Sequence, residues 1–303
     1  MTAARGGTQS IERSIKLMRA LAARARFGWR LSDLARHCDI DKGTARRILT
    51  CLVRERLAER SPADQRYLPG PLLFELGLAL TDFDEFKMAA YPLLDQLSSQ
   101  TNAVGFLCLR SGDDLVCAAR IGEVPDHAFT LNLGTRRPLA GSSGGAALLI
   151  TLPAEERQAL FERNCLALTQ QATSVHPSLE RLLNQSLEMG MGYNEGRLVP
   201  GWNSYAIALF QKQEAFASVM ICAPAGHFTH ARLENSLAVL KRTAQRLQDI
   251  SETVFGRQRR PEPCPPFIPA RVTPERLLDN LHERRERRKA TSSAPGTQHT
   301  VPQ

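Results

Sequence analysis

The chain has 303 residues, 43% hydrophobic and 23% charged, a globular composition with enough length for two domains. It has no apolar run near the roughly 20 residues of a membrane span and no secretory signal in residues 1–10, so we expect a cytoplasmic protein. The net charge is +8 over residues 1–70, −5 over 71–255 and +5 over 256–303, so only the two ends suit a polyanion. The seven cysteines are scattered without a CxxC pair, so we expect no disulfide, metal site or cofactor.

Residues 10–54 show three helical patterns separated by short connections. Apolar residues recur at helical spacing from Ile11 to Leu21, and a short second helix follows Ser32. The third helix has a full apolar stripe, which consists of Ala45, Ile48, Leu49, Leu52 and Val53. Its opposite face carries cations and hydroxyls, the groups that a DNA major groove and its phosphates require.

Two short strands, at residues 57–60 and 66–68, are joined by a polar turn and predict the wing of a winged helix-turn-helix. A small helical subdomain with a solvated basic face is the alternative, but it does not account for three helices, a tight turn and a hairpin in this order. The residues that we expect to contact DNA are Ser32, Lys42, Thr44, Arg46, Arg47, Thr50, Arg54, Arg60 and Arg66.

The middle of the chain predicts a mixed domain behind a linker. Residues 71–99 are mainly helical in pattern, and Pro92 marks a break or the start of a second helix. The strands that we expect lie at residues 103–109, 115–120, 127–131, 205–209 and 215–223. We expect one helix that ends at residue 149 and three more at residues 154–164, 178–189 and 232–253. Such a mixture with hairpin-length turns indicates α+β, with a mainly antiparallel sheet flanked by helices.

Several short stretches are each a weak family signature, but their order and spacing together are specific. They are Ser10-Ile-Glu-Arg-Ser-Ile-Lys-Leu, Leu31-Ser-Asp-Leu-Ala-Arg, Lys42-Gly-Thr-Ala-Arg-Arg-Ile-Leu, Leu52-Val, Arg66-Tyr67 and Gly70-Pro71. Together they resemble the IclR family of bacterial transcriptional regulators, and the resemblance continues to about residue 250. It implies a GAF-like effector-binding domain behind the winged helix, in dimers or tetramers on palindromic operators. Gly43 departs from the usual Ser, so that one phosphate contact is either missing or made by Thr44.

The domains expected on these grounds are the DNA-binding domain at 1–70, the linker helix at 71–99, the effector-binding domain at 100–255 and a Pro-rich basic tail at 256–303. The tail lies beyond the resemblance, and its composition predicts a largely disordered segment. A solvated extension and an additional non-specific DNA contact both remain open for it.

Two segments resemble the walls of the family's effector pocket. One is Arg137-Pro138-Leu139 with the following Gly/Ser loop; the other runs from Gly192-Tyr193 to Ser204. A Gly- and Ser-rich loop that opens a helix offers backbone N–H groups to a carboxylate, although its glycines also suit a tight turn alone. The residues that we expect to bind the effector are Leu139, Ser143, Gly144, Glu195, Trp202, Ser204, Tyr205, Met220 and Cys222.

This pocket departs from the family in ways that make it less polar. Met220 and Cys222 stand where the family often has two serines, and Ala146 replaces a common Lys. Trp202 and Tyr205 lie nearby in the sequence. We therefore expect a small carboxylate effector that is aromatic or otherwise partly apolar, rather than a small ketoacid.

The sequence thus predicts a ligand-responsive, sequence-specific transcriptional regulator. We expect a homodimer or homotetramer on a palindromic double-stranded DNA operator, associated with the nucleoid, and a contact with RNA polymerase if it activates. One alternative is a ligand-independent architectural DNA-binding protein. Another is a serine hydrolase, because Gly141-Ser-Ser-Gly-Gly matches GxSxG, but that motif needs a buried parallel strand before the serine. Arg136-Arg137-Pro138 make a poor central strand, so we expect no enzyme.

Overall fold

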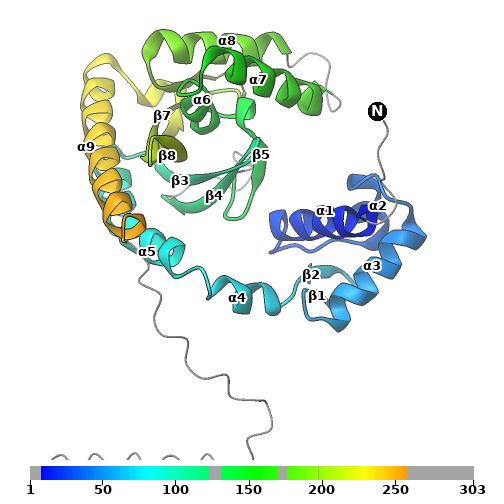
Figure 1. Ribbon diagram of the computed structural model, residues 1–303. Helices are drawn as coiled ribbons and strands as arrows, with labels where there is room; N and C mark the ends of the chain where they lie inside the picture. Colours follow the sequence, from blue (N-terminus) through cyan, green and yellow to red (C-terminus); the bar gives the residue numbers. More distant parts are fainter. Residues whose placement is uncertain (1–7, 123–130, 170–175, 197, 258–303) are drawn as a thin grey trace, which may run out of the picture. The chain divides into compact units, whose positions relative to one another are not determined.

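The computed structural model describes residues 8–122, 131–169, 176–196 and 198–257 (Figure 1). Most of the strand expected at residues 127–131 and nearly all of the basic tail lie outside these ranges. Within them, no helix is both long and apolar enough to cross a membrane.

The N-terminal part is a winged helix-turn-helix, as predicted. Its elements are α1 (Gln9–Ala23), α2 (Leu31–His37), α3 (Lys42–Arg54), β1 (Ala58–Arg60) and β2 (Tyr67–Pro69), the two strands being antiparallel. The start of α2 differs from the expectation, because Ser32 lies inside the helix and Arg30 is its N-cap. Asp41 caps α3, its Oδ1 accepting a hydrogen bond of 2.8 Å from the backbone N–H of Thr44.

One hydrophobic core holds these helices and the wing together. The apolar stripe of α3 packs on α1 and α2, and Leu17, Leu34 and Leu49 are fully buried there. Trp29 fastens the wing to this core, since its backbone pairs with that of Tyr67 and its indole N–H donates to a carbonyl of α1. The helix α3, the recognition helix of such a domain, and the wing are therefore positioned by the same buried side chains.

The linker contains two helices, α4 (Leu72–Gly77) and α5 (Thr81–Thr101). The break expected at Pro92 is wrong, since α5 runs through it and the interruption falls at residues 78–80. Proline removes one backbone donor from a helix. The buried face of α5 nevertheless continues on both sides of Pro92, from Phe86 to Leu97, and this packing outweighs the lost hydrogen bond.

The C-terminal part is built on one six-stranded antiparallel sheet, which confirms the predicted α+β class. Its strands follow the order β5-β4-β3-β8-β7-β6. Their bounds are β3 (Val104–Ser111), β4 (Asp114–Ile121), β5 (Arg136–Pro138), β6 (Gly192–Glu195), β7 (Trp202–Gln211) and β8 (Glu214–Pro224). The edge strands β5 and β6 were not expected, whereas β3, β4, β7 and β8 lie where the sequence placed strands.

Helices cover both faces of this sheet (Figure 1). The helices besides α5 are α6 (Ser143–Leu149), α7 (Ala154–Thr169), α8 (His176–Met189) and α9 (His230–Phe255), with a 3-10 turn, η1 (Leu139–Gly141), before α6. On β8, Val219 and Ile221 face α5 and α9, whereas Met220 and Cys222 face the layer of α6, α7 and α8. This alternation decides which side chains reach the candidate pocket.

Candidate DNA-binding surface and effector pocket

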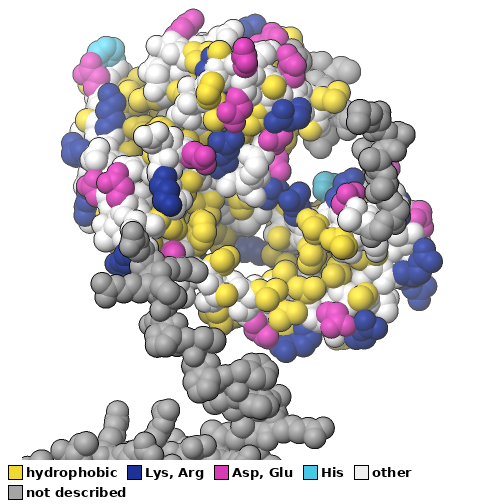
Figure 2. Space-filling view, viewed as in Figure 1, with side chains coloured by type: hydrophobic (Ala, Val, Ile, Leu, Met, Phe, Trp, Pro, Cys, Tyr) yellow, Lys and Arg dark blue, Asp and Glu magenta, His cyan; other side chains and the backbone are white. Residues whose placement is uncertain are grey.

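The exposed side of α3 is rich in cations and hydroxyls. The expected DNA-binding side chains on α3 that are exposed are Lys42, Arg46, Arg47, Thr50 and Arg54, and Thr44 is half-buried. Figure 2 shows Lys and Arg side chains on the surface of the winged-helix part. The apolar stripe of α3 is turned into the core, so the opposite, polar face is the one left for DNA.

The cations on α3 differ in how far they are already engaged. Lys42 and Arg46 have no ion-pair partner among the described residues, and Arg47 donates only to the Thr44 hydroxyl, at 3.1 Å. Arg54, by contrast, forms an ion pair of 2.8 Å with Glu55. The first turns of α3 therefore hold the cations most available to phosphates and base edges.

The two wing arginines have different surroundings. Arg66 donates to the carbonyl of Phe27 at 2.9 Å and lies 3.1 Å from the carboxylate of Asp64, which ties it to the base of the wing. Arg60 is exposed, with its guanidinium 5.6 Å from the centre of the Tyr67 ring. Arg60 is therefore available for a further contact. The contacts of Arg66, by contrast, fix it at the base of the wing.

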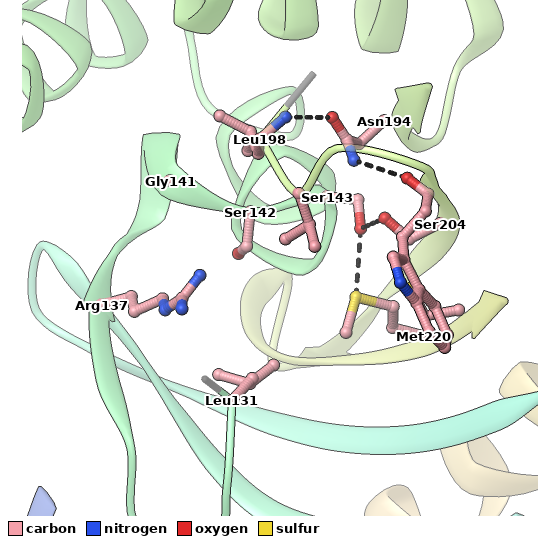
Figure 3. Close-up of a pocket in the computed structure, with 12 residues that line it drawn as sticks. Leu131, Arg137, Gly141, Ser142, Ser143, Asn194, Leu198, Ser204 and Met220 are labelled. Carbon is pink, nitrogen blue, oxygen red and sulfur yellow. Dashed lines mark hydrogen bonds between the residues drawn. The ribbon is translucent and has the colours of Figure 1, made fainter. Parts of the chain in front are cut away.

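The C-terminal part contains a cavity of about 30 Å³ between the sheet and the segment that leads into α6. Its lining consists of Leu131, Arg137, Gly141, Ser142, Ser143, Asn194, Leu198, Val199, Trp202, Ser204, Met220 and Cys222 (Figure 3). The expected effector residues that line it are Ser143, Trp202, Ser204, Met220 and Cys222. Two wall segments and the strand β8, far apart in the sequence, thus converge on one site.

Four expected residues do not line this cavity: Leu139, Gly144, Glu195 and Tyr205. Tyr205 follows Ser204 on β7 and therefore points to the other face of the sheet, where it packs on Tyr193 and Phe228. Leu139 is fully buried in the core, and Glu195 is exposed at the end of β6. Gly144 lies beside Met220 without reaching the cavity.

Hydroxyl groups organise one side of the cavity. The Oγ atoms of Ser143 and Ser204 are 2.7 Å apart, and the Ser143 Oγ lies 3.0 Å from the sulfur of Met220 (Figure 3). The Ser142 Oγ accepts the Gly145 N–H at 3.0 Å, so the N-cap of α6 uses one of the N–H groups that the sequence offered to a ligand. The polar groups on this side of the cavity are therefore mainly side-chain hydroxyls.

Among the described residues that line the cavity, Arg137 is the charged one, and the expected effector residues did not include it, although its segment was assigned to a wall. Its neighbour Arg136 forms an ion pair of 2.7 Å with Asp114, whereas the guanidinium of Arg137 is directed into the cavity (Figure 3). Burial lowers the pKa of Arg137, and no ion-pair partner for it exists in the described ranges. Side chains alternate along a strand, so these two arginines point to opposite sides, but the sequence analysis placed no strand at β5.

The remaining lining residues shape the walls. Asn194 holds the loop before β7 through its side chain, which accepts the Leu198 N–H at 3.2 Å and donates to the Trp202 carbonyl at 3.4 Å. Burial raises the pKa of the Cys222 thiol to about 12, against a hydrogen bond with Ser204 that lowers it. Cys222 is therefore a neutral, partly apolar wall at any ordinary pH.

The GxSxG segment does not form a nucleophile elbow in this fold. The strand before it, β5, is a three-residue edge strand in an antiparallel sheet. The described partners of the Ser143 hydroxyl are Ser204 and Met220, while His227 bonds to the carbonyl of Thr101 at 2.9 Å. In the described part of the chain, no cluster of His, Cys, Asp and Glu suits a metal ion either.

A winged helix-turn-helix joined by a helical linker to a domain with a pocket defines a ligand-binding transcriptional regulator. The comparisons name the family. Residues 10–62 match the IclR helix-turn-helix domain, and residues 79–249 match the bacterial transcriptional regulator IclR C-terminal domain. The chain belongs to the IclR family of bacterial transcriptional regulators.

Relatives and solved structures agree with this assignment. The transcriptional repressor AllR of Escherichia coli is 25% identical over 85% of this chain and 94% of its own. The glycerol operon regulatory protein of Streptomyces griseus is 27% identical over 60% of this chain and 71% of its own. Among solved structures, an IclR-family regulator from Brucella abortus has a TM-score of 0.64 at 21% identity, over 82% and 94% of the two chains. An IclR homologue from Microbacterium hydrocarbonoxydans, solved with 4-hydroxybenzoate, has a TM-score of 0.61 at 17% identity, over 80% and 99%.

Proposed function

We propose that this regulator senses a small, partly apolar carboxylate, with aromatic acids as the first candidates, and that Arg137 binds the carboxylate. The observation that carries the proposal is the guanidinium of Arg137, which is directed into the cavity and has no acidic partner in the described ranges. Arg137 is half-buried, so its charge is partly desolvated, and a carboxylate is the group that a guanidinium binds with two parallel hydrogen bonds.

The apolar walls support an acid with a hydrocarbon body. Leu131, Trp202 and Met220 line the cavity together with the neutral thiol of Cys222. A ring offers hydrocarbon surface to such apolar side chains, whereas a small ketoacid has little to place against them. The solved neighbour from Microbacterium hydrocarbonoxydans, which holds 4-hydroxybenzoate, has the same fold and is consistent with an acid of this size.

On the DNA side, we propose that two copies place their recognition helices in successive major grooves of a palindromic operator. Lys42, Arg46 and Arg47 bear on phosphates and bases, and Arg60 on the flank. Apolar side chains are exposed on α1, on α4 and in the segment after α4 (Figure 2), and we propose that they form the surface for the second copy. These side chains are Ile11, Ile15, Phe74, Leu76, Leu78 and Leu80. Pairing of such dimers into tetramers, a nucleoid location and a contact with RNA polymerase at activated promoters belong to the same proposal.

The effector must bind one arrangement of the dimer better than the other, since otherwise it cannot change DNA binding. The linker helices α4 and α5 connect the winged helix to the sheet that carries the cavity. We propose that they transmit the change.

The test is the melting temperature of the purified protein with benzoate, 4-hydroxybenzoate, pyruvate and benzamide. A ligand at 100 times its Kd adds about 2.7 kcal/mol to the unfolding free energy. We expect the aromatic acids to raise the melting temperature, and neutral benzamide and small pyruvate to leave it unchanged. R137Q abolishes the rise, while R242A, an equal loss of charge at an exposed position of α9, retains it.

Operator binding with the same compounds separates the alternatives. If pyruvate alone raises the melting temperature, the aromatic assignment is wrong. If no acid changes either the melting temperature or operator affinity, the ligand-independent DNA-binding alternative replaces the proposal.

A further inference from the structure

We propose that Met220 fills the inner half of the effector site in the ligand-free protein, and that the effector displaces it to reach the hydroxyls of Ser143, Ser204 and Ser218. The effector is then a two-ended molecule, with a carboxylate at Arg137 and a hydrogen-bonding group at its far end. This inference rests on the proposed carboxylate function and deepens it.

The size of the cavity requires a displacement. The cavity has about 30 Å³, far less than the roughly 150 Å³ of a cavity that holds a benzene ring. A ligand of the proposed class therefore lies fully inside the cavity only when a lining side chain moves.

Met220 is the lining side chain best suited to move. Methionine is unbranched, with three rotatable bonds, and adapts to different packing at low cost. Two neighbours of Met220 are small, since Ala206 is its register partner on β7 and a Cβ at Gly144 would lie 3.8 Å from its sulfur, whereas the buried Phe106 is its register partner on β3. The contact of the sulfur with the Ser143 hydroxyl, 3.0 Å, is of the kind that a ligand oxygen replaces with a stronger one.

A further buried hydroxyl, that of Ser218, lies near Met220. It is fully buried two residues before Met220 on β8, on the same face of the sheet, and its Oγ has no hydrogen-bond partner. Ser218 and Met220 both border Gly144, because a Cβ there would lie 3.1 Å from the Ser218 Oγ. A buried hydroxyl without a partner costs free energy that a polar ligand atom recovers.

The polar groups thus stand at two ends of one site. Figure 3 shows Arg137 reaching in from one side, with Ser143, Ser204 and Met220 grouped on the other. Between them, the walls include the apolar side chains of Leu131 and Trp202. An acid with an apolar body and a terminal hydroxyl matches this order of charges and surfaces, and 4-hydroxybenzoate is a suitable probe.

The experiment measures Kd for benzoate, 4-methylbenzoate and 4-hydroxybenzoate by isothermal titration calorimetry with the full-length protein. We expect the parent protein to bind 4-hydroxybenzoate ~10-fold more tightly than benzoate, the ratio that one good buried hydrogen bond gives. S218A lowers this ratio several-fold and removes no hydrogen bond of the ligand-free protein, so it tests the proposal even if another variant folds poorly. M220A binds all three acids more tightly, because no side chain must be displaced, and gains most for 4-methylbenzoate.

V219A is the matched control, since Val219 is equally buried on the same strand but faces the opposite side of the sheet. It should leave the three Kd values in the same ratios. Equal ratios in S218A and the parent protein, or weaker binding of every acid by a folded M220A, would overturn this inference while the dependence on Arg137 still supports the carboxylate function. If neither the parent protein nor M220A binds any acid, both proposals fall.

Discussion

The Oγ atoms of Ser143 and Ser204 lie 2.7 Å apart, although 61 residues separate them in the chain. Ser143 begins α6 and Ser204 lies on β7, so this hydrogen bond joins the helical layer to the sheet at the wall of the candidate pocket. Both side chains are buried, and burial makes the bond matter for stability as well as for ligand binding.

The first prediction concerns this bond. S204A leaves the buried Ser143 hydroxyl with the Met220 sulfur alone and also removes the hydrogen bond of Ser204 with the Cys222 thiol, so the unfolding free energy should fall by at least about 1 kcal/mol. Ser236 is the contrast, because it is equally buried on α9 and its Oγ has no partner. S236A should therefore be neutral or slightly stabilising. Urea unfolding of both variants checks this, and equal losses would show that the Ser143–Ser204 bond contributes nothing specific.

The second prediction concerns the cap of the recognition helix. Hydrogen bonds from the side chain and the backbone N–H of Thr44 hold the pKa of Asp41 below its ordinary value. A carboxylate with a depressed folded-state pKa stabilises the protein above its unfolded-state pKa, about 3.9, and loses this effect as the pH falls through the folded-state value. D41A should lower the melting temperature at pH 7, and the difference from the parent protein should narrow below about pH 4.

D41N is the control for the cap, because asparagine is an equally good N-cap residue. It should melt close to the parent protein at pH 7. If D41N melts as early as D41A, charge alone accounts for the effect, and the hydrogen bond to Thr44 does not.

The third prediction concerns Gly192 on β6. A Cβ at this position would collide with the carbonyl oxygen of Ser143 and lie 2.8 Å from the backbone nitrogen of Ala147. G192A must push α6 away from the sheet, so we expect a loss of about 1–3 kcal/mol in unfolding free energy and weaker effector binding. G226A, where a Cβ meets open space, is the control, and a similar loss there would remove the steric explanation.

The sequence predicted the elements whose side chains repeat with a clear period. The stripe from Ala45 to Val53 defines α3 because each of its residues packs on the same core. The edge strand β6, by contrast, has four residues and no β-branched side chain, so its pairing with β7 forms it rather than its own preference. Pro92 failed as a boundary signal for the same reason, since tertiary packing outweighed a local preference.

The candidate pocket was predicted in its segments more accurately than in its single residues. Ser204 and Tyr205 are neighbours on a strand, and the period of two allows only one of them to face the cavity. The same rule separates Arg136, paired with Asp114, from Arg137, directed into the cavity. The sequence contains this alternation but not the identity of the buried face, which the packing of α5 and α9 against the sheet decides.

The last prediction concerns Arg47 on the recognition helix. Its guanidinium has only the Thr44 hydroxyl as a described partner, so R47A should weaken operator binding by roughly 1–3 kcal/mol and relax the preference at one base position. Arg54 already pairs with Glu55, so R54A should cost less. R242A on α9 is the control for net charge. Competition binding against random DNA distinguishes a base contact from a phosphate contact. An equal loss of affinity for both DNAs would make Arg47 a phosphate contact, and no loss for either would show that Arg47 does not contact DNA.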